Sequence, residues 1–258
     1  MKIVDLILTE AKKPEVLETR EQIEDWLKKR GKRIEGTWKI NDDLSVEVTG
    51  DVDLSKLKMT KLPVKFKKVG GRFFVRETPL ITLEGCPDEV GTWFDCSYTD
   101  IKNLIGGPKA INTSKSQYND QYQTNNCQQL TSLEGIAEDA KELNVGFCKN
   151  LKELDYLPKN IRRITACAAG LTTLQGIEKR AKSLEALQIN ANNIEEYILG
   201  TLKIPSLKWQ SVIFKTDKEV TPLTQAGKII DSVLSSGGDI LEVCDELIDA
   251  GLDRMAKY

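Results

Sequence analysis

One apolar pattern returns at nearly constant spacing along most of this 258-residue chain. Four of the six steps between successive units are 21 residues, and the other two are 28 and 23. A fixed period of this length indicates a solenoid, in which stacked coils bury the apolar faces of their neighbours. The seven units begin at Val52, Phe73, Phe94, Tyr122, Leu143, Ile164 and Leu187.

The spacing inside one unit predicts the path of one coil. The unit Phe94-x-Cys96-x-x-Thr99-x-Ile101-x-x-Leu104 begins with two apolar side chains on one face of a short strand, because side chains alternate along a strand. The Thr99 position turns the chain, and a buried Asn or Cys at this position can bond to backbone groups at the bend. The last two apolar residues cover the next side of the coil. We therefore expect seven parallel strands, adjacent in one sheet and about 4.8 Å apart.

This pattern resembles the leucine-rich repeat, which has the form LxLxxN/CxL and a period of about 20–29 residues. The resemblance covers about residues 50–200. It implies an α/β, leucine-rich-repeat-like solenoid with a parallel strand ladder and helical caps at both ends. Cys127 and Cys148 occupy the N/C position and Cys96 lies in a strand, so we expect these three thiols to pack in the core.

The same reading divides the chain into four parts. Residues 51–200 are the solenoid, with about seven coils, and residues 19–50 are an N-terminal helix and strand cap. Residues 201–258 are a C-terminal helical cap, and residues 1–18 are a leader or a capping segment. The ends of a solenoid need covers, because the outermost coils would otherwise expose their apolar faces.

Local signals support both caps. Thr19 and Gln22 form a capping-box pattern that opens a helix, and the segment Trp38–Gly50 predicts a hairpin. Two amphipathic helices are expected over Leu223–Leu234 and Ile240–Met255, with Cys244 in the core. They form either a cap or a separate helical docking module.

A closer resemblance rests on longer segments. The chain contains "INDDLSVEVTGDVDLSKLKMTKLPVKFKKVGG" over Ile40–Gly71, then "LEGCPDEVGTWFDCS" from Leu83, and "LTSLEG" over Leu130–Gly135. These segments resemble a group of poorly characterised proteins encoded by large tailed bacteriophages. The resemblance implies a phage origin and no particular biochemical activity.

The first eleven residues, "MKIVDLILTEA", are similar to the capsid-targeting leaders of internal head proteins in contractile-tailed phages. Such leaders begin with Met-Lys and are cut after a Leu/Ile-x-Glu triplet. Here the triplet is Leu8-Thr9-Glu10, and Ala11 would follow the cut. The alternative is an N-terminal capping helix.

Composition narrows the chemistry. The net charge is −2, from 37 basic and 39 acidic residues, so nucleic acid is an unlikely partner. Histidine is absent, and no Gly-rich phosphate loop, metal-spaced Cys pair or nucleophile elbow occurs, so we expect no enzyme, cofactor or metal. No apolar run approaches the roughly 18 residues needed to span a bilayer. The six Cys without a CxxC pair favour a reducing compartment.

The outward strand positions give the candidate binding surface, because an open solenoid commonly binds proteins on this face. Outward aromatic residues beside arginines have the composition of interface hot spots. The alternative is that the N-terminal cap or the polar insertion Asn112–Asn126 covers the aromatic rings. The candidate residues are Arg72, Phe74, Arg76, Trp93, Asp95, Tyr98, Gln123 and Asn144.

We therefore expect a non-enzymatic protein-binding module that acts on a host or phage protein by steric occupation or scaffolding. Its expected location is the host cytoplasm. A second hypothesis is an internal virion protein, packaged in the capsid interior through the leader and delivered with DNA. A minor alternative is an enzyme that uses surface carboxylates or Cys167.

Overall fold

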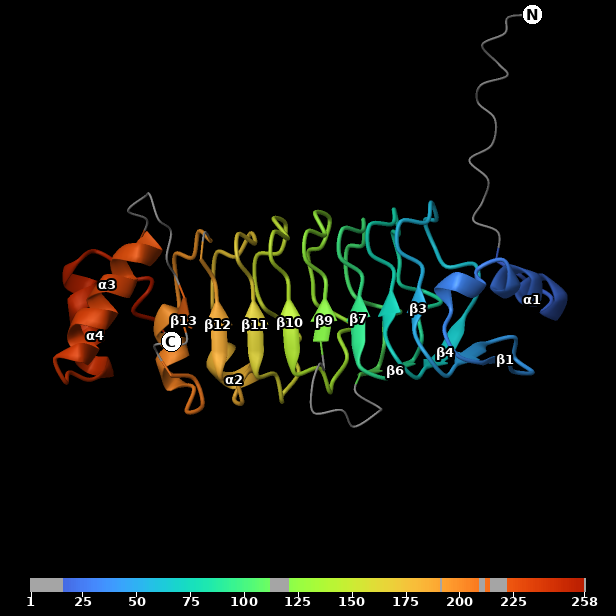
Figure 1. Cartoon of the computed structure of the whole chain (residues 1–258). Coiled ribbons are helices and arrows are strands. Elements are labelled where there is room, and N and C mark those ends of the chain that lie inside the picture. The colour runs from blue at the N-terminus through green and yellow to red at the C-terminus, as the bar shows by residue number, and fades with distance from the viewer. Residues whose placement is uncertain (1–15, 112–120, 191, 209–211, 214–221, 258) are drawn as a thin grey trace, which may run out of the picture.

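The computed structural model describes residues 16–111, 121–190, 192–208, 212–213 and 222–257. The chain forms an elongated β-solenoid of about six turns, with mixed α/β content and parallel strands stacked along its length (Figure 1). Helix α1 lies at one end of the stack, and helices α3 and α4 lie at the other (Figure 1). The candidate binding surface, at the outward strand positions, therefore belongs to a long, regular stack of strands.

One sheet runs through the whole solenoid, and we call it the ladder sheet. Its eight strands are all parallel and follow one another in chain order. The prediction of seven adjacent parallel strands is confirmed, and β13 is an eighth strand that was not predicted. The strands are β3 (Val52–Asp53), β5 (Phe73–Phe74), β7 (Trp93–Asp95), β9 (Gln121–Gln123), β10 (Glu142–Asn144), β11 (Arg163–Thr165), β12 (Ala186–Gln188) and β13 (Val212–Ile213).

A second sheet covers only the first coils, and the repeat pattern did not predict it. The hairpin expected within 38–50 is confirmed, because β1 and β2 pair antiparallel. Strands β4, β6 and β8 then add to β2 in parallel, one from each successive coil. The five strands are β1 (Trp38–Ile40), β2 (Val46–Val48), β4 (Phe66–Val69), β6 (Glu89–Val90) and β8 (Ala110–Ile111).

Aromatic rings fill the space between the two sheets. Phe66 of the second sheet meets Phe73 of the ladder sheet with ring centroids 5.2 Å apart. Phe73 stacks on Phe94 at 6.1 Å, and Phe94 packs against Tyr122 at 4.9 Å. All four side chains are fully buried, so each coil covers the apolar face of the next.

In five of the seven predicted units, the turn after the strand is held by a side chain that bonds to backbone oxygen, from Thr78, Thr99, Cys127, Cys148 and Asn192. The Thr99 hydroxyl donates to the carbonyl oxygen of Cys96 at 2.7 Å. The Cys148 thiol donates to the carbonyl oxygen of Thr124 at 3.0 Å. In the seventh unit, Asn192 Nδ2 donates to the carbonyl oxygen of Ile189 at 2.8 Å and also reaches the preceding coil. These bonds satisfy backbone groups that would otherwise be buried without partners.

A left-handed residue follows each strand at the same place in six coils. The backbone φ angles at this corner lie between 51° and 64°. Such angles are uncommon for residues other than glycine, so their repetition shows that one corner geometry is reused along the stack. The six residues are Lys56, Glu77, Tyr98, Asn126, Phe147 and Ala168.

The N-terminal helix forms as its sequence predicts. Helix α1 spans Arg20–Lys28, and Thr19 and Gln22 make the expected capping box. Its buried face consists of Ile23, Trp26 and Leu27. A short 3-10 helix, η2, follows over Gly31–Arg33.

The described residues after β11 contain four helical segments. Helix α2 spans Ile177–Arg180, η3 spans Ile198–Lys203, α3 spans Pro222–Ser235 and α4 spans Ile240–Asp249. Of the described helices, none is long and apolar enough to cross a membrane.

The prediction that the last helix reaches Met255 is wrong. Gly251 adopts a φ of 73°, and the Leu252 amide donates to the carbonyl oxygen of Leu247 at 2.8 Å. A left-handed glycine followed by such a bond is a common way for a helix to end, because glycine adopts this conformation without a steric penalty. The helix therefore ends at Asp249.

All six cysteines are free thiols. Cys86, Cys96, Cys127 and Cys148 are buried, in agreement with the packing role expected of the last three. Cys244 was expected in the core, but it is half-buried, as is Cys167. In the part of the chain that the structure describes, no group of His, Cys, Asp or Glu side chains could hold a metal ion.

Candidate protein-binding face

The centre of the predicted face is a contact between two aromatic rings on neighbouring ladder strands. Phe74 of β5 and Trp93 of β7 meet edge to face, with centroids 5.4 Å apart and ring planes at 81°. Both side chains are half-buried. Alternation along the strands sends both rings to the outer side of the sheet, because their neighbours Phe73 and Phe94 point inward and are fully buried.

Two arginines cover the Phe74 ring. The guanidinium carbon of Arg72 lies 5.5 Å from the ring centroid, and that of Arg76 lies 5.4 Å from it. Both distances are within the range of cation–π attraction. We call Arg72, Phe74, Arg76 and Trp93 the aromatic–arginine patch.

The two arginines are held differently. Arg72 Nε donates to Asp51 Oδ2 at 2.7 Å, and this hydrogen bond raises the pKa of Arg72 above its ordinary value. Arg76 Nη1 lies 4.0 Å from Asp95 Oδ2, which is at the limit of an ion pair. Arg72 is therefore fixed in place, whereas Arg76 keeps most of its hydrogen-bonding capacity for another acceptor.

Asp95 does not act as an exposed binding residue, contrary to expectation. Its exposed fraction is 5 %, and Oδ1 accepts a hydrogen bond from the Ser97 amide at 2.9 Å. Burial raises the pKa of Asp95 above its ordinary value, although the Ser97 hydrogen bonds and Arg76 oppose this shift. Asn144 makes the same bond to the Gly146 amide at 3.0 Å. Both side chains therefore shape the end of a strand.

The other predicted residues lie outside this contact, and Asn144 is two strands from Trp93. Tyr98 lies on the left-handed corner and is 53 % exposed. Gln123 is half-buried, and its Nε2 donates to Gln121 Oε1 at 3.3 Å. The structure thus brings Arg72, Phe74, Arg76 and Trp93 together and leaves Tyr98, Gln123 and Asn144 outside this cluster.

Two features bear on whether the patch is covered. Trp93 Nε1 is buried and has no hydrogen-bond partner among the described residues. Such an N–H loses its hydrogen bond to water on folding. The insertion Asn112–Asn126, the expected alternative cover, lies mostly outside the described residues, as do all four predicted leader residues, Leu8 to Ala11.

A further exposed aromatic side chain was not among the predicted site residues. Phe147 is 53 % exposed and lies on the same corner column as Tyr98, with Asn126 between them. Its position four residues after Leu143 is the signal that could have identified it, since Tyr98 also follows Phe94 by four.

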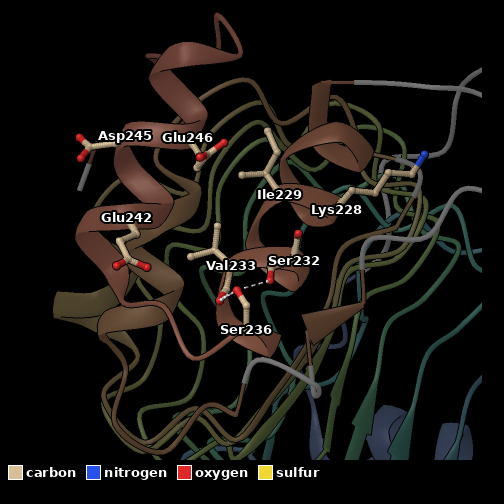
Figure 2. Close-up of a pocket in the computed structure, with 8 residues that line it drawn as sticks. All are labelled: Lys228, Ile229, Ser232, Val233, Ser236, Glu242, Asp245 and Glu246. Atoms are coloured by element: carbon tan, nitrogen blue, oxygen red, sulfur yellow. Dashed lines mark hydrogen bonds between the residues drawn. The ribbon is translucent and has the colours of Figure 1, made fainter.

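Helices α3 and α4 enclose a pocket of about 570 Å³ (Figure 2). Just after the end of α3, the Ser236 hydroxyl donates a hydrogen bond to the Ser232 carbonyl oxygen at 3.0 Å (Figure 2). Of its charged lining residues, one is basic and three are acidic. The eight lining residues are Lys228, Ile229, Ser232, Val233, Ser236, Glu242, Asp245 and Glu246. No metal-binding group is formed among these described residues.

Comparison of the chain with protein-family models, with curated proteins and with solved structures finds no match. The function must therefore be argued from the geometry of the chain itself.

Proposed function

We propose that this chain is a non-enzymatic protein-binding module, and that the aromatic–arginine patch contacts the partner. The observation that carries this proposal is the Phe74–Trp93 contact, with two guanidinium groups over Phe74, on the outer face of a regular sheet. Trp, Tyr and Arg dominate the residues that contribute most to protein interfaces. The sheet holds them rigidly, so little conformational entropy is lost on binding.

The proposal includes a leucine-rich-repeat-like identity with helical caps. It is supported by the polar side chains that close five of the turns, between Thr78 and Asn192, because this is the position of Asn or Cys in the repeat. Helix α1 and the α3–α4 pair at the two ends of the stack support the capping role (Figure 1).

The patch also indicates what the partner offers. Arg72 is already paired with Asp51, whereas Arg76 has only a distant partner in Asp95. We propose that the partner, a host or phage protein in the host cytoplasm, presents an apolar side chain to Trp93 and a carboxylate to Arg76. Binding would then act by steric occupation or scaffolding.

Affinity capture from host and infected-cell lysates identifies the partner, and the variant Trp93→Ala tests the patch. Loss of a hot-spot aromatic residue should weaken the complex by about 2 kcal/mol or more. The control is Tyr156→Ala, because Tyr156 is an exposed aromatic residue outside the patch. Its affinity should not change.

Melting temperature is measured on the same proteins. A Trp93→Ala variant that folds normally and binds normally would exclude the patch. Attention would then move to the insertion Asn112–Asn126 or to helices α3 and α4. A strongly lowered melting temperature with binding lost only through unfolding would show that Trp93 is a covered packing residue.

A second candidate function rests on the leader-like sequence ending at Leu8-Thr9-Glu10. We propose as the alternative that the chain is packaged in the capsid interior and delivered with DNA. Mass spectrometry of purified particles separates the two hypotheses: a chain beginning at Ala11 supports packaging, and absence of the chain from particles contradicts it.

A further inference from the structure

A cationic pocket lies where helix α1 ends, next to the aromatic–arginine patch, since Arg33 bonds to Asp53 and Asp53 pairs with Phe74. Six consecutive residues, Lys28–Arg33, line it together with Leu57, and five of the six carry a positive charge. The pocket has a volume of about 800 Å³ and no acidic lining residue. Helix α1 ends at Lys28 and the 3-10 helix η2 begins at Gly31, so the backbone curls and gathers these side chains around one space.

Two arginines in this pocket are held in position. The guanidinium of Arg30 lies 4.0 Å from the centroid of the Trp26 ring, and its Nη1 donates to the Trp26 carbonyl oxygen at 3.1 Å. Arg33 Nη1 donates to the carbonyl oxygens of Asp53 and Ser55, at 3.2 and 3.1 Å. These contacts anchor Arg30 to helix α1 and Arg33 to the end of the first ladder strand, so both groups are pre-organised for a ligand.

No acidic residue lines the pocket with these two arginines, although Asp53, beside the pocket, interacts electrostatically with Arg33. Arg30 Nε is buried and has no hydrogen-bond partner among the described residues. Burial, and then the nearby charge of Arg33, lower the pKa of Arg30 below its ordinary value. Like charges held this close repel one another, so an anion between them would remove a cost that the free protein carries.

The lysines of the pocket add positive charge that is held only by weak contacts. Lys28 pairs with Glu24 at 3.2 Å, and Lys29 pairs with Asp25 at 2.6 Å. Both pairs are exposed helix-surface contacts, which are weak and exchange easily. Lys32 is exposed and makes no ion pair with any described residue.

We propose that this pocket binds a small phosphate-bearing molecule with at least two phosphoryl groups, of the size of a nucleoside diphosphate. Arginine forks match phosphate oxygens in geometry, and lysines contribute point charge. The volume lies within the range of small-molecule sites, and Leu57 offers an apolar surface to the organic part. A long nucleic acid fits less well, because the whole chain carries a net charge of −2 and would repel it beyond the pocket.

Isothermal titration at low ionic strength tests the site on the full chain, with pyrophosphate, adenosine 5′-diphosphate and adenosine as probes. The two phosphate compounds should bind, and adenosine should not. Lys32→Glu should weaken pyrophosphate binding about tenfold, the effect of losing one charged contact and adding repulsion. The matched control is Lys102→Glu, which makes the same charge change at an exposed lysine elsewhere on the solenoid and should leave the affinity unchanged.

Three results would overturn the proposal. The first is an absence of pyrophosphate binding to the wild-type protein at millimolar concentration. The second is equal weakening by Lys32→Glu and Lys102→Glu, which would indicate only a general charge effect. The third is binding of a single-stranded oligonucleotide, with steep salt dependence, that pyrophosphate does not compete away, because the surface would then recognise a nucleic acid backbone. Melting temperatures of both variants confirm that they fold.

Discussion

The two halves of the solenoid share one sheet but are built differently behind it. Residues 38–111 have a second sheet facing the ladder sheet, whereas residues 121–190 have turns and the short helix α2 on that side. The buried side chains that fill the interior also differ between the two halves. Aromatic rings such as Phe73 and Phe94 occupy the first half, and buried alanines begin at Ala137. The aromatic–arginine patch belongs to the two-sheet half, and the cationic pocket lies at its N-terminal end, formed by Lys28–Arg33 and Leu57.

The corner between the sheets shows how the first half is possible. A Cβ on Gly91 would lie 1.8 Å from the Gly70 carbonyl oxygen, and one on Gly70 would lie 2.3 Å from that of Thr49. Only glycine lets successive coils approach so closely. In the second half the position of Gly70 and Gly91 is occupied by residues with buried side chains, Ala140, Ile161 and Leu184. We infer that the glycines at this corner, Gly70 and Gly91, allow the second sheet to form.

The largest effect should come from the aromatic filling. Phe94→Ala should cost about 3–5 kcal/mol of unfolding free energy, because two stiff sheets cannot collapse into the cavity. Leu143→Ala, at the same repeat position in the second half, should cost about 2–5 kcal/mol and less than Phe94→Ala. Urea unfolding of both variants measures this difference. A smaller loss for Phe94→Ala would contradict the role of the rings as the spacer between the sheets.

The glycine corner should give the next largest effect. Gly91→Ala should destabilise the protein by about 3 kcal/mol, because the new methyl group clashes with backbone that cannot move aside easily. Gly31→Ala is the control, since a Cβ there would have no heavy atom within 4 Å. Its stability should change by less than about 0.5 kcal/mol. Equal thermal unfolding of the two variants would refute the account of the corner.

Asp95 allows a comparison with Asn144, which makes the same turn without a charge. Burial raises the pKa of folded Asp95, so the folded state holds this proton more tightly than the unfolded state. The wild-type protein should therefore lose stability relative to Asp95→Asn as pH rises from about 4, the unfolded value, through the raised folded value, by about 1 kcal/mol or less. Unfolding curves across this interval measure it. A wild-type protein that gains stability there relative to Asp95→Asn would show the opposite sign.

The thiols should give the smallest effect on the fold. Cys96, Cys127 and Cys148 should resist a thiol reagent in the native protein, and half-buried Cys167 should react first. Burial raises the pKa of both Cys96 and Cys167, so labelling is best compared at mildly alkaline pH. Mass spectra with and without reductant should agree. Early labelling of Cys127 would contradict its place in the core.

Much of the ladder sheet could be predicted, because its periodic signal is repeated seven times. The eighth strand, Val212–Ile213, was missed because it follows Leu187 by 25 residues and lacks the later apolar positions. The second sheet was missed because segments such as Glu89–Val90 are only two residues long. A pair of residues carries too little pattern to distinguish a strand from a turn.

The candidate site was partly predictable for the same reason. Alternation placed Phe74 and Trp93 on one face. The register of β5 and β7 pairs Phe74 with Asp95, so Trp93 is a diagonal neighbour that an aromatic ring can reach. Alternation could not show that Asp95 is buried, since the strand-end turn covers it. The cationic pocket was not predicted either, because a run of basic residues becomes a pocket only when the chain curls around it.

The sequence by itself determined the coil period, the inward apolar pairs, the turn residues and the helix at Arg20–Lys28, because each depends on neighbours within one coil. Only the tertiary structure decided where a second sheet forms and which outward side chains touch. Those outcomes depend on how closely one coil approaches the next, as Gly91 and Gly70 show. These close contacts are between residues about one repeat apart. The packing between coils, rather than local conformational preference, determines them.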